Sequence, residues 1–420
     1  MAIAISSCRI CGFDQLTPIF SLGELYVSNF IDSPEQQKEI KASLELVLCN
    51  ESNGGCGLLQ LKHTVPQELM YQNYWYRSGM NKTMIDELHG IATKAESLLT
   101  LSAGDLVLDI GANDGTLLRG YKINGLNLIG FEPAQNLISY AVQGTTKIIN
   151  DFFSFVAWKQ EFGNVKSKVV TAIAMFYDLD DPNAFVADVA RCLDKEGIFI
   201  IQMSYLPSML YQNAFDNICH EHLEYYSLLS LENLLRRHGL EVFDVELNDV
   251  NGGSFRTYVK HVGEHIGINI PLGAGERVKK LRAEELKLGL NNRKIYDEFA
   301  RRVYDLRQRL CEFIRKEAAR GKKIHVYGAS TKGNTLLQFY GLDNRLIVAA
   351  AERNPDKWGR KTTGTLIPII SEEQARREKP DYFLVLPWHF MKEFRQREAE
   401  FLKNGGKFIV PLPEFRIVSE

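Results

Sequence analysis

The densest group of ionisable side chains lies in residues 217–227, which contain His220, Glu221 and His222. Three interpretations of this segment stay open. In an extended chain, alternate side chains point the same way, so the two histidines could form a metal-binding pair. They could instead be hydrogen-bonded residues that anchor a loop. One of them could also be a general base positioned by Glu221, because histidine accepts protons near neutral pH.

A second candidate site begins where the apolar run 106–110 enters a glycine turn at Gly111. Glycine lets the backbone turn tightly and approach a ligand, and the helix expected behind it would offer free amide groups. The positions of Gly111, Asn113 and Gly115 do not give the dinucleotide pattern G-x-G-x-x-G, and no Gly-Lys-Ser/Thr ending marks a P-loop. The remaining ligand is S-adenosylmethionine (SAM), whose amino-acid part is zwitterionic and could meet the loop amides with its carboxylate.

Three carboxylates lie at or just after the carboxyl ends of three successive predicted strands, where each could contact SAM. Asp109, near the end of the first strand, can take part in binding the ammonium group. Glu132 comes directly after the second strand and can accept hydrogen bonds from both ribose hydroxyls. Asp151 follows the third strand and could meet the adenine amino group. Asp109 alone could be a helix cap and Glu132 a surface carboxylate, but together their positions favour SAM binding.

Four of the seven cysteines precede residue 60, and Cys8-x-x-Cys11 forms half of a zinc knuckle. In a reducing compartment such clustering favours metal over disulfides. Cys49 and Cys56 can complete a Cys₄ set, although the six residues between them exceed the usual two to four. Two alternatives stay open, a knuckle that recruits His63 and buried thiols in a module without metal. The expected role of zinc is structural, because no Lys/Arg cluster with interleaved aromatic residues surrounds it.

The elements that would position these groups fall into three stretches of the 420-residue chain, which is long enough for two or three domains. Residues 1–70 form the zinc-binding module. Residues 71–245 alternate buried-strand runs with amphipathic helices, as parallel sheets with crossover helices do. Residues 246–420 hold a polar helical connector over 275–320 and a second α/β domain. Strands are expected at 106–110, 128–131, 147–149, 169–174, 197–202, 324–327, 346–351, 382–386 and 407–410.

Composition narrows the classes of partner. The formal net charge of −2 gives no global attraction to nucleic acid or to an anionic membrane. No apolar run approaches the roughly 20 residues of a membrane-spanning helix. The first residues carry no basic side chain and reach Cys8 too soon for a secretory signal. We expect a cytoplasmic protein with a small-molecule substrate and neither nucleic-acid nor membrane partners, and the sequence leaves its oligomeric state open.

Several segments, in this order, resemble the three-domain SAM-dependent C-methyltransferases of deoxysugar biosynthesis, and the likeness covers nearly the whole chain. The segments that carry it are Cys8-x-x-Cys11-Gly12, Tyr74-Trp75-Tyr76-Arg77-Ser78-Gly79, Asp109-Ile110-Gly111-Ala112-Asn113-Asp114-Gly115, the run 219–228 around His220-Glu221-His222, Asn251-Gly252-Gly253-Ser254-Phe255-Arg256, the run 327–335 and the run 352–360. The resemblance implies a class I Rossmann-like methyltransferase core of the α/β class, with a small N-terminal zinc module and a second Rossmann-like domain. It also implies a nucleotide-linked, typically dTDP-linked, 4-keto-6-deoxysugar as substrate, methylated at C3 or C5.

The resemblance further implies that His222 is the base, with Glu221 as its neighbouring glutamate and Tyr76 as a tyrosine of the N-terminal run. A ketone at C4 acidifies the neighbouring C–H, so His222 would remove that proton. The enolate oxygen would then need hydrogen-bond donors, such as Tyr76 or His220. Some members of the family carry a tyrosine where this chain has Cys219, so a phenol hydrogen bond is missing here.

In the C-terminal domain, Ser330, Lys332 and Asn334 stand at an expected helix N-terminus, where they could hold the diphosphate or nucleotide. A solvated surface lysine is an equal alternative for Lys332. Rival functions are an O- or N-methyltransferase of the same architecture and a non-catalytic SAM-binding or zinc-mediated assembly protein. The glycine spacing disfavours a nicotinamide-linked oxidoreductase, and the His-Glu-His segment disfavours a non-catalytic protein.

Overall fold

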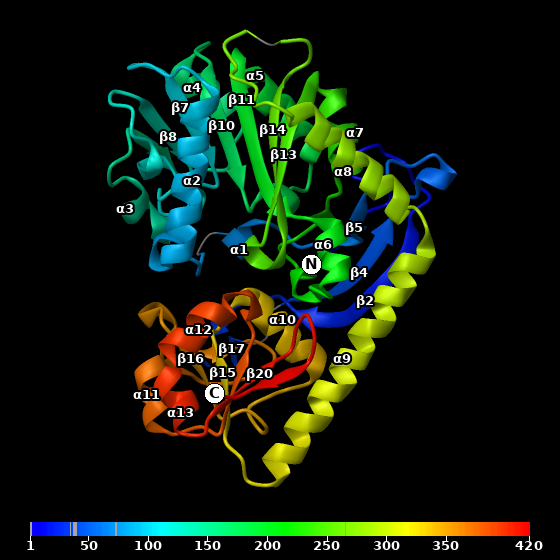
Figure 1. The fold of residues 1–420 in the computed structure, drawn as a ribbon, viewed down its shortest axis with the longest axis vertical. Helices are drawn as coiled ribbons and strands as arrows, with labels where there is room; N and C mark the ends of the chain where they lie inside the picture. The colour runs from blue at the N-terminus through cyan, green and yellow to red at the C-terminus, as the bar shows by residue number, and fades with distance from the viewer. Residues whose placement is uncertain (1, 34, 37–39, 72–73, 265) are drawn as a thin grey trace.

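The computed structural model describes residues 2–33, 35–36, 40–71, 74–264 and 266–420. The described strands form sheets of seven, six and four strands, together with two short two-stranded pairings. The seven-stranded and six-stranded sheets lie at opposite ends of the molecule, and the four-stranded sheet lies to one side between them (Figure 1). Three separately built units therefore border one central region.

The seven-stranded sheet comes from the middle of the chain. Its order is β13 (Leu240–Asn248), β14 (Ser254–His261), β11 (Leu193–Ser204), β10 (Ser167–Ile173), β7 (Leu106–Ile110), β8 (Asn127–Phe131) and β9 (Lys147–Ile149). The strands from β11 to β9 are parallel, whereas β14 is antiparallel to both of its neighbours. The carboxyl ends of β7 to β10 meet at one edge, which is where ligands bind in open α/β sheets.

Helices cover both faces of this sheet, because alternate side chains of each strand point to opposite faces. In β7, Val107 belongs to the core cluster with Leu88 of α2, whereas Leu108 belongs to the cluster with Trp158 of α4 and Val189 of α5. The helices of this unit are α2 (Lys82–Leu98), α3 (Ile138–Ala141), α4 (Phe155–Phe162), α5 (Pro182–Cys192) and α7 (Leu228–Arg237). Both faces are buried, which suits the continuous apolar runs of the strands.

The four-stranded sheet of the N-terminal module includes a strand from another part of the chain. Its order is β12 (Glu224–Tyr225), β5 (Leu59–Leu61), β4 (Lys41–Leu48) and β2 (Thr17–Tyr26), all antiparallel. The short pairings are β1 (Ile3–Ala4) with β6 (His63–Thr64) and β3 (Phe30–Ile31) with β17 (Lys361–Thr362). The segment that follows His222 is therefore held as a strand of the N-terminal sheet.

The C-terminal sheet is parallel except at one edge. Its order is β18 (Ile369–Ser371), β16 (Ala349–Glu352), β15 (Ile324–Tyr327), β19 (Tyr382–Val385), β20 (Lys407–Val410) and the antiparallel β21 (Arg416–Val418). Its helices are α10 (Thr331–Tyr340), α11 (Glu372–Arg377), α12 (Met391–Arg397) and α13 (Ala399–Lys403). The loop between β15 and α10 faces the region between the sheets. The carboxyl-end edge of the second Rossmann-like domain therefore faces the same region as that of the first.

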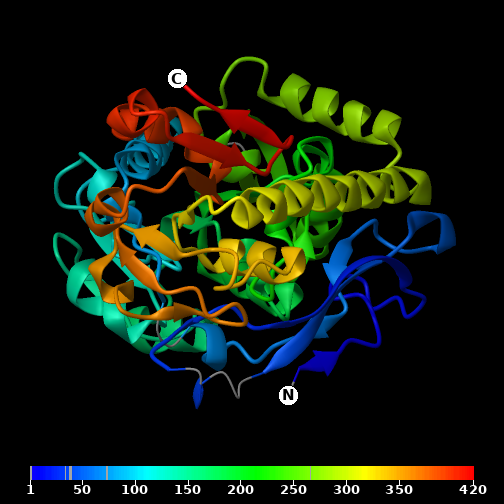
Figure 2. The same ribbon diagram turned by 90° about the horizontal axis from the view of Figure 1, so that it is seen from below.

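Helices α8 (Ala274–Leu288) and α9 (Arg293–Ala319) connect the two α/β units. In α9, Phe299, Val303, Leu306 and Leu310 are buried at helical spacing. They belong to one core cluster with residues of the N-terminal sheet, of α6 (Leu206–Tyr211) and of the C-terminal sheet. Helix α9 lies beside β2 in both views (Figures 1 and 2), so the N-terminal module and the C-terminal domain share a hydrophobic core.

The predicted fold class is confirmed, and the bounds predicted for 106–110, 147–149, 324–327 and 407–410 match the structure. The helix expected behind Gly111 is wrong, because only a 3₁₀ turn, Leu118–Gly120, follows the loop. This turn packs against α2, where a Cβ on Gly120 would lie 2.9 Å from the Cα of His89. None of the described helices combines the length and apolar content that crossing a membrane requires.

Candidate active site

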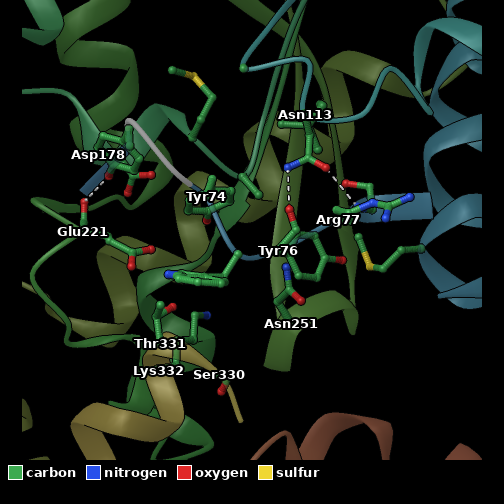
Figure 3. A pocket seen from close by; sticks show the side chains of 18 of the residues that line it. Tyr74, Tyr76, Arg77, Asn113, Asp178, Glu221, Asn251, Ser330, Thr331 and Lys332 are labelled. Atoms are coloured by element: carbon green, nitrogen blue, oxygen red, sulfur yellow. Dashed lines mark hydrogen bonds between the residues drawn. The ribbon is translucent and has the colours of Figure 1, made fainter. Parts of the chain in front are cut away.

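A cavity of about 740 Å³ lies among the three units, and we call it the central cavity. Its lining comes from the loops after β7, β8, β9 and β10, from the segment around Tyr76, from Glu221 and His222, and from the loops after β15 and β16. Figure 3 shows side chains from the N-terminal run, the central domain and the C-terminal domain pointing into this space. The predicted cofactor, catalytic and substrate groups therefore border one cavity.

His222 is held in a defined tautomer. Its Nδ1 lies 2.8 Å from the carbonyl oxygen of Asn217. Because a carbonyl only accepts hydrogen bonds, Nδ1 carries the proton and Nε2 carries the lone pair. Burial, reinforced by the charge of Lys332, holds the pKa of His222 well below 6.5. The imidazole is therefore neutral at neutral pH and can accept a proton at Nε2.

His220 lies away from the central cavity, contrary to the expectation that it could donate to an enolate. Its Nε2 lies 3.0 Å from the carbonyl oxygen of Ala42 in the N-terminal sheet, and burial lowers its pKa to about 4. His220 and His222 therefore have different surroundings. The only group of three or more potential metal ligands among the described residues is the cysteine cluster, so the interpretation of a histidine metal pair is not supported.

Glu221 and Asp178 are carboxyl groups that line the central cavity, and Glu221 is buried whereas Asp178 is half-buried. Burial raises the pKa of Glu221 to about 7, while hydrogen bonding to Thr331 and the charge of Lys332 oppose that shift. Burial and the carboxyl group of Glu221 raise the pKa of Asp178 well above 3.8. The Tyr71 hydroxyl donates to the Glu221 carbonyl oxygen at 3.3 Å (Figure 3). Sequence reasoning missed Asp178, although it follows the predicted fourth strand.

Two of the three predicted SAM carboxylates are buried and have no ion-pair partner among the described side chains. Asp109 is 3% exposed and accepts a hydrogen bond from the Thr171 hydroxyl at 2.6 Å, so it is not a helix cap. Glu132 is 6% exposed, so it is not a surface carboxylate. Burial raises the pKa of each to about 7. A bound ammonium group would give Asp109 an ion-pair partner, and a ribose would give Glu132 hydroxyl donors in addition to the backbone amides that it already accepts from.

The loop after β7 turns through left-handed backbone conformations. Gly111 has a φ of +72° and lines the central cavity, which fits close approach of a ligand. Gly115 does not line the cavity; its φ is +77° and an added Cβ would lie 2.8 Å from the Ala141 carbonyl oxygen, so packing explains this glycine. Asn113 has a φ of +52° and donates its backbone N–H to Glu132 at 2.7 Å. Asp151 is exposed at the cavity rim and accepts from the Phe152 amide.

Tyr76 lines the same cavity and is 43% exposed. The Asn113 side chain holds its backbone, because Nδ2 donates to the Tyr76 carbonyl oxygen at 3.0 Å and Oδ1 accepts from the Ser78 amide at 3.0 Å (Figure 3). Arg77 stacks on the ring of Tyr140, 3.6 Å from its centroid. The predicted cofactor loop therefore also positions the predicted tyrosine.

The four N-terminal cysteines converge. The sulfur atoms of Cys8 and Cys56 are 3.5 Å apart, those of Cys11 and Cys49 are 3.4 Å apart, and all four lie within 4.8 Å of one another. A tetrahedron with zinc–sulfur bonds of about 2.3 Å has edges of about 3.8 Å, so the four thiols fit a zinc ion. The wide spacing of the second pair is taken up by a 3₁₀ turn, Glu51–Asn53. His63 does not belong to this group.

The C-terminal domain brings two of its three predicted residues to the central cavity. Ser330 caps α10 by accepting from the Gly333 amide at 3.0 Å. Lys332 is half-buried and donates to Asn217 Oδ1 at 2.7 Å, so it is not a freely solvated lysine. Asn334 does not line the cavity; it is 1% exposed and donates to the Asn29 carbonyl oxygen at 2.8 Å. Asn334 therefore ties α10 to the N-terminal module.

Glu352, which sequence reasoning missed, repeats the arrangement of Glu132. Glu132 directly follows β8 and accepts from Ala134, two residues later, and from Asn113 in the loop of the neighbouring strand, at 2.8 and 2.7 Å. Glu352 ends β16 and accepts from Asn354, two residues later, and from Ala329 in the loop after β15, at 2.9 and 3.0 Å. Both carboxylates border the central cavity. Glu352 could have been predicted, because it directly follows the strand expected at 346–351.

The fold, together with the carboxylates and the glycine turn at one edge of the seven-stranded sheet, defines a class I SAM-dependent methyltransferase. Three family models match successive parts of the chain. Residues 8–71 match a zinc-binding domain, residues 76–245 a methyltransferase domain and residues 249–413 a C-methyltransferase C-terminal domain. C-methyltransferase NovU from Streptomyces niveus is 32% identical over 422 residues, covering 99% of this chain and 97% of NovU. The chain belongs to the family of three-domain C-methyltransferases, and it uses SAM and binds zinc.

Two solved structures similar to this chain each cover less than half of it. A protein from Pyrococcus horikoshii OT3 is 15% identical, with a TM-score of 0.36 over 44% of this chain and 94% of that chain. Magnesium protoporphyrin IX methyltransferase from Synechocystis PCC 6803, solved with bound SAM, is 12% identical, with a TM-score of 0.30 over 42% of this chain and 77% of that chain.

Proposed function

We propose that the chain methylates carbon next to the ketone of a nucleotide-linked 4-keto-deoxysugar, with His222 as the general base. The observation that carries this proposal is the state of the His222 ring. Its Nδ1–H is committed to the Asn217 carbonyl, the ring lines the central cavity, and no described residue makes a hydrogen bond to its Nε2. A neutral, oriented imidazole of this kind suits proton removal from a carbon acid.

The reaction proceeds in two steps. His222 Nε2 takes the proton from the carbon next to the ketone, and the electron pair of that C–H bond moves onto the ketone oxygen as an enolate. Tyr76 donates a hydrogen bond to that oxygen. The carbon then attacks the methyl group of SAM, the C–S bond breaks, and S-adenosylhomocysteine leaves as a neutral thioether. The main contribution of the protein is to align the two bound substrates.

A direct test supplies the purified protein with SAM and a dTDP-linked 4-keto-6-deoxysugar. We expect one S-adenosylhomocysteine per sugar consumed and a product with a new carbon-bound methyl group, detected by mass spectrometry and NMR. A methyl group on oxygen or nitrogen, or no product with any nucleotide-linked keto sugar, would contradict the proposed substrate class.

For SAM, we propose that Asp109 binds the ammonium group, that Glu132 accepts from the ribose hydroxyls and that Asp151 meets the adenine amino group. Gly111 and Asn113 form the turn against which the donor lies. Burial of Asp109 and Glu132 without ion-pair partners supports this assignment, because SAM supplies a positive charge for Asp109 and hydroxyl donors for Glu132.

These carboxylates make SAM affinity dependent on pH. Cation binding needs ionised Asp109, whose pKa is about 7. A group with this pKa loses most of its ionised fraction between pH 7.5 and pH 6, so we expect affinity to fall about tenfold over that interval. The SAM ammonium group stays charged on acidification, so the loss arises from the protein. Isothermal titration calorimetry at a series of pH values measures it, and a constant affinity would argue against this role of Asp109.

For the substrate, we propose that the C-terminal domain holds the nucleotide, with Glu352 accepting from the pentose and Ser330 and Lys332 facing the diphosphate. The repeated arrangement of Glu132 and Glu352 supports this assignment, because each sheet then has a carboxylate at the central cavity in the position that suits a nucleoside. The N-terminus of the ten-residue helix α10 adds amide groups and a favourable dipole for an anion.

Glu352→Gln tests this assignment, because it replaces one acceptor oxygen of the carboxylate with a donor. We expect the KM for the nucleotide-linked sugar to rise about tenfold, the cost of roughly one charge-assisted hydrogen bond, while SAM affinity stays unchanged. Glu373→Gln, an exposed carboxylate in α11 paired with Arg377, is the matched control and should behave as wild type. An unchanged KM for the Glu352 variant would remove Glu352 from the substrate site.

A further inference from the structure

A buried arginine lies between the zinc knuckle and the catalytic segment. Arg9 stands between Cys8 and Cys11, and its side chain is 2% exposed. Its Nη1 donates to the Leu61 carbonyl oxygen at 2.7 Å, and its Nη2 donates to the Thr64 hydroxyl at 2.7 Å. The knuckle is thereby fastened to β5 and β6 of its own module.

The same guanidinium reaches beyond the module. Its Nε lies 3.7 Å from Glu224 Oε1 and 3.9 Å from Asp180 Oδ1. The Glu224 side chain is fully buried, and Arg9 is its only ion-pair partner among the described residues. Asp180 belongs to the cavity-lining loop after β10. The buried Arg9 guanidinium therefore lies close to two segments that border the central cavity, the segment that contains Glu224 and the loop after β10.

Glu224 is joined to His222 by a short, fixed path. It begins β12, which pairs with β5 in the register Glu224 to Gln60. Between the two residues, Leu223 accepts from the Leu61 amide at 2.8 Å and donates to the Tyr177 carbonyl oxygen at 2.8 Å. A shift of β12 along β5 would therefore move the His222 ring relative to the cavity. The side chains of a strand repeat every two residues, so a strand of only two residues specifies its register weakly. A specific side-chain interaction must therefore hold β12 in register.

We propose that the Arg9–Glu224 ion pair is a positioning device through which the zinc-bound knuckle holds His222 in register. Arg9 and Glu224 are positioning residues, since neither lines the central cavity. Cys8 and Cys11, two of the four sulfur ligands, fix the backbone on both sides of Arg9, and the planar guanidinium transmits that fixed position to β12. The proposal rests on the proposed role of His222 as base and adds a catalytic consequence to a structural metal site.

The test compares Arg9→Met and Glu224→Gln with Lys62→Met as the control. Lys62 is a cation of the same module, is 38% exposed and pairs only with Glu45 among the described residues. We expect kcat to fall about 10- to 100-fold in the two test variants, because small displacements of a catalytic group cost that much. The KM for the sugar, SAM affinity and one zinc per chain should stay within twofold of wild type. The control should match wild type throughout.

Two readouts separate positioning from a general loss of stability. Amide hydrogen exchange should increase in residues 217–226 of Arg9→Met and stay unchanged in Lys62→Met. In a double-mutant cycle, Arg9→Met should add no further loss to His222→Asn, because Arg9 acts only through that ring. Additive losses, or a kcat for Arg9→Met equal to wild type, would overturn the proposal.

Folding failure and failure of the base assignment have distinct signatures. If Arg9→Met does not fold, Glu224→Gln decides, because it is isosteric and leaves Arg9 paired with Asp180; a wild-type kcat for that variant would overturn the proposal. If His222→Asn itself turns over normally, the base assignment fails whatever Arg9 does. If only His222→Asn is inactive, the base assignment stands and the positioning role is excluded.

Discussion

His222→Asn is expected to lose methyl transfer almost completely, with kcat lowered by about two to four orders of magnitude, the usual contribution of a general base. Asparagine has no basic nitrogen, but it is small enough to leave the cavity lining in place. SAM affinity should stay within about twofold of wild type, because His222 is proposed to contact only the sugar. Single-turnover kinetics with a nucleotide-linked keto sugar, together with SAM calorimetry, measure both quantities.

His220→Asn is the matched control, two residues away. His220 does not line the central cavity and its ring hydrogen-bonds to the Ala42 carbonyl oxygen, so its loss should lower stability rather than turnover per folded molecule. Turnover near the wild-type value in His222→Asn, by protein that still binds SAM, would contradict the base assignment. Equal losses of turnover in both variants would indicate that catalysis depends on the integrity of the whole segment and not on the His222 ring.

Cys49→Ser is expected to abolish zinc binding and, with it, both the fold of the N-terminal module and catalysis. Structural zinc contributes on the order of 10 kcal/mol to the folding of small metal-binding modules, so loss of one thiolate leaves the module without its main stabilising interaction. Cys49 is fully buried and adjoins the 3₁₀ turn of the knuckle. Metal analysis, thermal unfolding and the methyl-transfer assay together test this expectation.

Cys192→Ala provides the control for that experiment. Cys192 is fully buried in α5 and lies outside the cysteine cluster, so this variant should retain one zinc per chain and near-normal turnover. A zinc content and transfer rate unchanged in Cys49→Ser would show that the four cysteines are not the metal site.

Much of the central domain could be predicted because its strands are continuous apolar runs. The run 106–110, which is short and bounded by a glycine turn, favours a strand buried on both faces, and acidic residues at the ends of such strands in a parallel sheet meet at one edge. Asp109 and Glu132 followed from that rule. The cysteine cluster could be predicted from residue type and spacing, since thiols gathered in a short module are typical of zinc sites.

Other features depend on long-range pairing that local pattern does not encode. The strand β12 is two residues long and joins a sheet formed by residues more than 150 positions earlier, so nothing local marks it. The difference between His220 and His222 arises because the His220 ring lies against Ala42 of β4, whereas the His222 ring lines the central cavity. Glu352 ends β16, and the same rule, applied to every strand, would have found it. Asp178 ends the 3₁₀ turn Phe176–Asp178 beyond β10, so that rule does not reach it. The hairpin of β13 and β14 was also not predicted, although apolar and polar side chains alternate over 240–242 and 244–247.

Hydrogen exchange at the carbon next to the ketone tests the role of His222 as the base most directly. The enzyme is incubated in D₂O with S-adenosylhomocysteine and the nucleotide-linked 4-keto sugar, so that deprotonation occurs without transfer. We expect the wild-type protein to introduce deuterium at that carbon and the His222→Asn variant not to do so. Exchange at equal rates in the two proteins, or none above the uncatalysed rate in either, would contradict that role.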